Sequence, residues 1–176
     1  MILDVSDEES HKAKIPHEIF LANLIGNHIL WFIASLGLAG SYWQPLALVP
    51  IVSFSVLIYI LWRAKRSKTI DSWYVMCHWQ ICAKRARIIL YMLFGLIFVA
   101  FLGWLGFTYM GMMEVAVYAM IGGMGVLPVM VTVLVLIVME QDIMHQAAQK
   151  KLPDSIVEAF PNPGVRVLDE APVPEA

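Results

Sequence analysis

Charged side chains are scarce in this chain of 176 residues. Asp, Glu, Lys and Arg together make up 15% of it, whereas soluble domains carry about a quarter. Hydrophobic residues make up 60%, and the mean hydropathy is +0.71. This composition argues against a soluble globular domain and for a membrane protein. The net charge of −2 leaves no broad basic surface, so we expect no direct binding of nucleic acid.

Cysteine and the familiar catalytic motifs are also scarce. The two cysteines, Cys77 and Cys82, fall in a segment expected in the cytoplasm, where thiols stay reduced, so we expect no structural disulfide. The sequence has no Gly-rich phosphate loop, no Ser-His-Asp set able to meet at one depth and no pair of carboxylates within a span. We therefore expect that the protein is not an enzyme on its own and needs no cofactor.

The N-terminal residues lack the features of a secretory signal. Residues 1–19 carry five acidic groups, four of them between Asp4 and Glu9, and have neither a basic start nor a small-residue cleavage site. We expect the first apolar run to serve as an uncleaved anchor in the membrane.

Four apolar runs are long enough to cross a bilayer. A hydrocarbon core about 30 Å thick needs about 20 apolar residues in a helix, and backbone groups in lipid must be satisfied within the segment. The sequence therefore predicts an all-α membrane protein with four transmembrane helices in a bundle, with Pro16 at the start of the first. The predicted spans are residues 20–42, 46–62, 88–107 and 115–139.

Basic residues predict the orientation of these spans. Seven of the twelve Lys and Arg residues lie between Arg63 and Arg87, and the others lie near the two termini. Because Lys and Arg are retained on the cytoplasmic side, we expect both termini and the 63–87 loop in the cytoplasm of a bacterium whose inner membrane holds the protein. Residues 1–19 form a cytoplasmic segment, and residues 140–176 form a Pro-rich acidic tail that we expect to be largely disordered.

The 63–87 loop is the most unusual segment outside the spans. A helix within it places aromatic and apolar side chains on a stripe, while its basic residues approach the lipid boundary. We expect an amphipathic helical loop, and either an interfacial helix or an extension of the third span fits the pattern. Aromatic side chains left in water attract a partner. The candidate interface residues are Trp73, Tyr74, Cys77, Trp79 and Ile81.

One polar cluster lies inside a predicted span. Asn23 and Asn27 are one helical turn apart, and His28 follows directly. An interhelical hydrogen-bond clasp is the plainer interpretation. The alternative makes His28 a proton relay or a ligand, since ionisable groups within a membrane are costly to bury.

Metal sites have weak support in the sequence. His78 and Cys82 are spaced i,i+4, but two ligands do not make a zinc site. The histidines at 28, 78 and 145 lie at different predicted depths, which argues against bis-histidine haem. The methionines near the outer turn suit Cu(I), although methionine commonly fills packing gaps. We therefore predict no metal site.

Gly122 to Pro128 is expected to be the least regular stretch of the fourth span, because glycines precede a helix-breaking proline.

The favoured function is a non-catalytic subunit or scaffold of a larger inner-membrane complex, such as a secretion, conjugation or respiratory assembly. It would contact other membrane subunits through the cytoplasmic loop, and a homo-oligomer is also open. The alternatives are a small oligomeric transporter or channel, for example for a metal ion, and a membrane redox subunit.

Overall fold

The computed structural model describes residues 3–42, 44–162 and 164, and within them it contains helices and no β-strand. Two π-helical segments, η1 and η2, interrupt longer helices. In chain order the elements are α1 (Asp7–Leu21), η1 (Ala22–Trp31), α2 (Phe32–Leu38), α3 (Gln44–Ile70), α4 (Trp73–Met110), α5 (Glu114–Met120), η2 (Ile121–Val126), α6 (Leu127–Ala148) and α7 (Asp154–Ala159).

Four continuous helical rods are long and apolar enough to cross a membrane. They are α1–η1–α2, α3, α4 and α5–η2–α6. This confirms the predicted all-helical fold with four candidate spans. Large apolar side chains are exposed along the rods, which suits contact with lipid.

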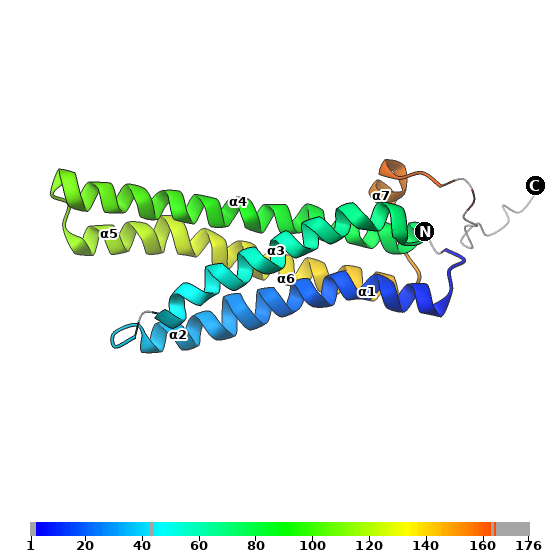
Figure 1. The fold of residues 1–176 in the computed structure, drawn as a ribbon, viewed down its shortest axis with the longest axis horizontal. Helices are drawn as coiled ribbons and strands as arrows, with labels where there is room; N and C mark the ends of the chain where they lie inside the picture. Colours follow the sequence, from blue (N-terminus) through cyan, green and yellow to red (C-terminus); the bar gives the residue numbers. More distant parts are fainter. Residues whose placement is uncertain (1–2, 43, 163, 165–176) are drawn as a thin grey trace, which may run out of the picture.

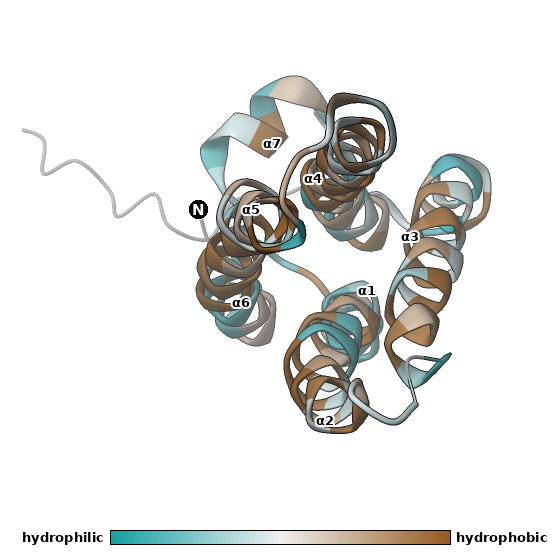
Figure 2. Ribbon diagram, turned by 90° about the vertical axis from the view of Figure 1, so that its left-hand side faces the viewer, coloured by the Kyte–Doolittle hydropathy of each residue, from teal (hydrophilic) through white to brown (hydrophobic). Residues whose placement is uncertain are grey.

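The rods run along one long axis (Figure 1). The start of α1, the α3–α4 turn and α7 lie at one end, and the α2–α3 and α4–α5 turns lie at the other. A view along the axis shows α7 beside α4, outside the four rods (Figure 2). We call the end that holds α7 the basic end, since the Lys and Arg residues of the described chain lie in the half of the bundle nearest to it.

All four rods contribute to one central hydrophobic core. Its fully buried side chains come from α1, η1, α3, α4 and α6, and include Phe20, Leu24, Leu57, Ile60, Ile89, Val133 and Leu136. This core lies next to the candidate site described below.

The first rod begins earlier than the sequence indicated. Ser6 caps α1, with its Oγ accepting from Glu9 N at 3.2 Å and Glu9 Oε2 accepting from Ser6 N at 3.2 Å. This capping box satisfies amides that the helix start leaves free. Pro16 therefore lies inside α1, and the expectation that it begins the helix was wrong.

The expected loop at 63–87 is also shorter. Helix α3 continues to Ile70 and α4 begins at Trp73, so Asp71 and Ser72 alone connect them. Arg63 braces the turn, with its guanidinium donating to both carboxylate oxygens of Asp71 at 2.7 and 3.0 Å. Of the two alternatives, the structure has the extension of the third span.

The C-terminal tail is more ordered than expected over its first part. Helix α6 continues to Ala148, and α7 packs on α4, where Trp73 Nε1 donates to Phe160 O at 2.7 Å. The predicted disorder of the far tail falls on residues outside the described ranges.

The fourth rod is irregular where the glycines and Pro128 predicted it. Its backbone turns π-helical over η2, directly before the helix that carries Pro128. Gly125 faces Leu96 of α4, and a Cβ added there would lie 2.6 Å from Leu96 Cδ1. The small residue thus allows close approach of the two rods.

Candidate functional site

Five chemically active side chains from three helices meet inside the bundle. We call this set, consisting of His17 of α1, His78, Cys82 and Arg85 of α4, and Glu140 of α6, the inner cluster. The side chains of His17 and Glu140 are 0% exposed, and His78 and Cys82 are also fully buried.

The α4 residues reach one place because of their spacing. His78, Cys82 and Arg85 follow the i, i+4, i+7 pattern, so they share one helix face. That face turns toward α1 and α6. Small residues beside it, such as Ala86, are buried as well and let the helices pack closely.

A chain of hydrogen bonds links the polar groups. Glu140 Oε2 lies 2.5 Å from His17 Nδ1, and His17 Nε2 lies 3.0 Å from His78 Nδ1. Arg85 Nη1 donates to Glu140 Oε1 at 3.0 Å and to Met139 O at 3.0 Å. Both carboxylate oxygens of Glu140 therefore have partners, which offsets the cost of burying its charge.

Two further features concern ligands. The ligand atoms of His17, Cys82 and Glu140 lie within 4.8 Å of one another. Cys82 Sγ also lies 3.3 Å from Pro16 O. In the described part of the chain, His78 Nε2 is buried without a hydrogen-bond partner. The arrangement can hold a metal ion or move a proton between imidazoles.

The sequence indicated only part of this cluster. It identified His78 and Cys82 as a ligand pair, but the partners His17 and Glu140 are 123 positions apart from each other. A usable signal was present, because His17 precedes the first predicted span by three residues and Glu140 directly follows the last one. Both therefore lie at the cytoplasmic ends of their predicted spans.

The polar cluster within the first span turns toward α3. Asn27 Nδ2 donates to Val49 O at 2.9 Å and to Asn23 Oδ1 at 3.3 Å, and Asn23 Nδ2 lies 3.5 Å from Ser53 Oγ. His28 Nε2 lies 3.2 Å from Ser53 Oγ. The geometry is that of the interhelical clasp. The alternative, in which His28 is a ligand or proton relay, would need a second ionisable side chain, and none is among these contacts.

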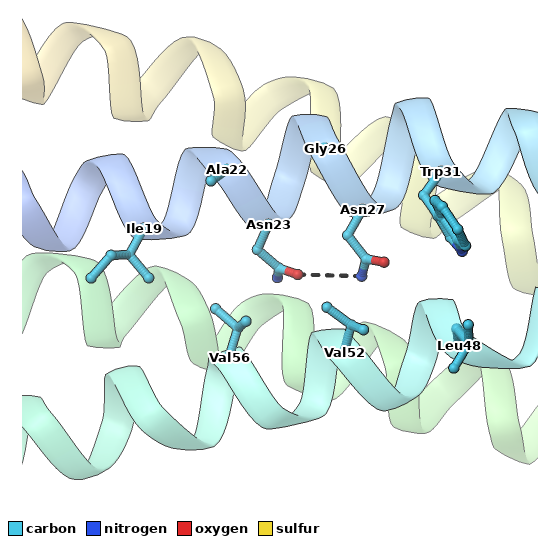
Figure 3. A pocket seen from close by; sticks show the side chains of 9 residues that line it. All are labelled: Ile19, Ala22, Asn23, Gly26, Asn27, Trp31, Leu48, Val52 and Val56. Atoms are coloured by element: carbon cyan, nitrogen blue, oxygen red, sulfur yellow. Dashed lines mark hydrogen bonds between the residues drawn. The ribbon is translucent and has the colours of Figure 1, made fainter.

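A groove of about 660 Å³ runs between the first rod and α3, and Asn23 and Asn27 of the clasp line it (Figure 3). Ala22 and Gly26, one turn apart, are exposed along it. A Cβ added at Gly26 would meet no atom of the described chain within 4 Å. The remaining lining residues are Ile19, Asn23, Asn27, Trp31, Leu48, Val52 and Val56. We call this feature the lateral groove.

The aromatic stripe expected to face a partner is covered by the chain itself. Tyr74, Cys77, Trp79 and Ile81 are buried, and Trp73 is half-buried. Most of the stripe is covered by the N-terminal residues, α6 and α7. Trp79 is covered by α1 and α3. The stripe is therefore no exposed apolar patch, because the extended helices fold these side chains into the bundle.

Comparisons with protein-family models, curated proteins and solved structures find no match. The fold alone thus defines the class. Four helices could span a membrane, which indicates a multi-pass membrane protein.

Proposed function

We propose that this protein is a non-catalytic integral subunit of a larger assembly in the bacterial inner membrane. The observation that carries the proposal is the lateral groove. We therefore propose that the partner binds at this groove and not at the 63–87 loop. A transmembrane helix of another subunit is the occupant that fits this groove.

The lining of the groove supports a helix more than a lipid chain. Ala22 and Gly26 form a small-xxx-small pattern, which lets two helix backbones approach closely. Both hydrogen bonds of the Asn27 side chain use its amide nitrogen, so its oxygen remains able to accept one from a partner. An acyl chain would use neither feature.

Filling the groove should therefore release the partner. We expect Gly26→Leu to reduce the amount of co-purified partner at least about fivefold, because overfilling a packed contact costs about 1–3 kcal/mol. The folded state should survive, since the space beside Gly26 is open. The measurement is quantitative mass spectrometry after gentle solubilisation, with differently tagged copies to detect a homo-oligomer.

Gly37→Leu is the matched control. Gly37 is exposed on the same rod, and a Cβ added there would also meet no atom of the described residues within 4 Å. Gly37 does not line the groove. If both variants retain the same partners as the wild type, the groove is not the contact.

The orientation is part of the same proposal. We expect reporter fusions at Lys68 and at Gln149 both to read cytoplasmic, because the Lys and Arg residues of the described chain gather toward the basic end. A periplasmic signal from either fusion would contradict the N-in, C-in arrangement.

The second candidate is a small oligomeric transporter or channel, for example for a metal ion, or a membrane redox subunit. The inner cluster favours it, since these ligand types are costly to bury together without a role. A cavity of about 240 Å³ beside His28 lies between the two halves of the bundle, but its lining is otherwise apolar. Metal analysis and an optical spectrum of the purified protein test this candidate, while co-purification of other subunits after gentle solubilisation tests the first.

A further inference from the structure

We propose that His17, Cys82 and Glu140 bind a divalent transition metal of the zinc class, and that this ion ties α1, α4 and α6 together. The sequence predicted no metal site because it offered two ligands from one helix. The fold adds an imidazole and a carboxylate from two other helices. The site lies inside the chain, so it does not depend on the proposed partner.

The ligand types select the ion. A thiolate, an imidazole and a carboxylate are the groups that bind Zn²⁺ in proteins, while Mg²⁺ and Ca²⁺ prefer sites made of oxygen atoms alone. Cys82 would bind as the thiolate and release its proton to solvent. With Glu140 it would supply two negative charges against the two positive charges of the ion.

The distances require a modest rearrangement. Metal–ligand bonds of about 2.0–2.3 Å in tetrahedral geometry place ligand atoms about 3.4 Å apart. The three ligand atoms lie within 4.8 Å of one another, with His17 Nδ1 and Glu140 Oε2 at 2.5 Å. The metal would replace the hydrogen between these two atoms, which would be released to solvent together with the Cys82 proton, and the two atoms would separate by about 1 Å.

Two neighbouring residues already hold the ligands in position. His78 Nδ1, 3.0 Å from His17 Nε2, can accept its hydrogen and thus direct the Nδ1 lone pair of His17 toward the ion. Arg85 occupies Oε1 of Glu140 and leaves Oε2 for the metal. Metal-binding histidines and carboxylates commonly have such outer partners. His78 and Arg85 are therefore positioning residues.

The test uses Co²⁺ as a spectroscopic substitute for Zn²⁺ on the full chain in mild detergent, after removal of bound metal with a chelator. We expect one equivalent of Co²⁺ to produce a near-ultraviolet band of thiolate-to-cobalt charge transfer. Zn²⁺ should abolish the band, and excess Mg²⁺ should leave it unchanged.

Cysteine variants assign the band. Cys82→Ser should lose it, while Cys77→Ser should keep it, because Cys77 is a buried cysteine of the same helix that lies outside the ligand group. His78→Gln should keep the band but weaken Co²⁺ binding about 10–100-fold. A purely structural role for His78 would leave the affinity unchanged.

Thermal unfolding provides a readout independent of colour. Zn²⁺ should raise the unfolding midpoint of the wild type and of Cys77→Ser, but not that of Cys82→Ser. The proposal is overturned if the folded wild type binds no Co²⁺ with a thiolate band, or if Cys77→Ser rather than Cys82→Ser abolishes it. In that case the inner cluster is a hydrogen-bonded network alone.

Discussion

Glu140→Ala is expected to lower the free energy of unfolding by about 3–5 kcal/mol, because removing one partner of a buried ion pair leaves the other uncompensated. In this protein the groups left behind are Arg85, whose side chain is 11% exposed, and His17, which is fully buried. The measurement is unfolding of the metal-free protein in mild detergent, which keeps the prediction separate from metal binding.

Glu114→Ala is the matched control. Glu114 is exposed at the opposite end of the bundle, where its side chain accepts a hydrogen bond from Tyr118 Oη at 2.7 Å. An exposed contact of this kind contributes about 1 kcal/mol or less. Equal effects of the two variants would mean that the charge of Glu140 does not compensate its neighbours.

Trp79→Ala should be of similar severity, at about 3–5 kcal/mol, because it removes a large buried side chain and leaves a cavity. Trp79 is 3% exposed and packs against Ala64, Val75 and Ala83, with the Arg63 guanidinium 4.9 Å from its ring centre. The expected result is a lower thermal midpoint and less folded protein in the membrane.

Trp62→Ala provides the comparison, since Trp62 belongs to α3 near the same end but is 54% exposed. It should change the free energy of unfolding little. If Trp79→Ala leaves the midpoint unchanged and instead releases a bound partner, Trp79 acts at an interface and its buried position is contradicted.

The fold could be predicted where the membrane dictates the sequence. Four apolar runs of sufficient length suffice to predict four helices, and Gly122 to Pro128 predicted the irregular part of the last one. The helices extend beyond the predicted spans, because hydropathy records only the lipid-facing length of a helix. It does not record the continuation of the helix beyond the apolar run, such as α3 from 63 to Ile70.

The polar residues were predictable only where they stand out from their neighbours. Asn23, Asn27 and His28 interrupt an apolar run, so they were found, and their contacts with α3 have the geometry of the clasp. His17 and Glu140 lie among other polar residues at the ends of runs. Nothing local distinguishes them from solvated charges, and only the packing of three helices brings them together.

The inner cluster is completed only when the last of its residues has been synthesised. Its members come from the first, third and fourth rods, and Glu140 is the last to be synthesised. Until the fourth rod inserts, Arg85 lacks the carboxylate that pairs with it in the finished bundle. A chain that holds only the first three rods therefore has an Arg85 guanidinium without the carboxylate that pairs with it at this helix interface.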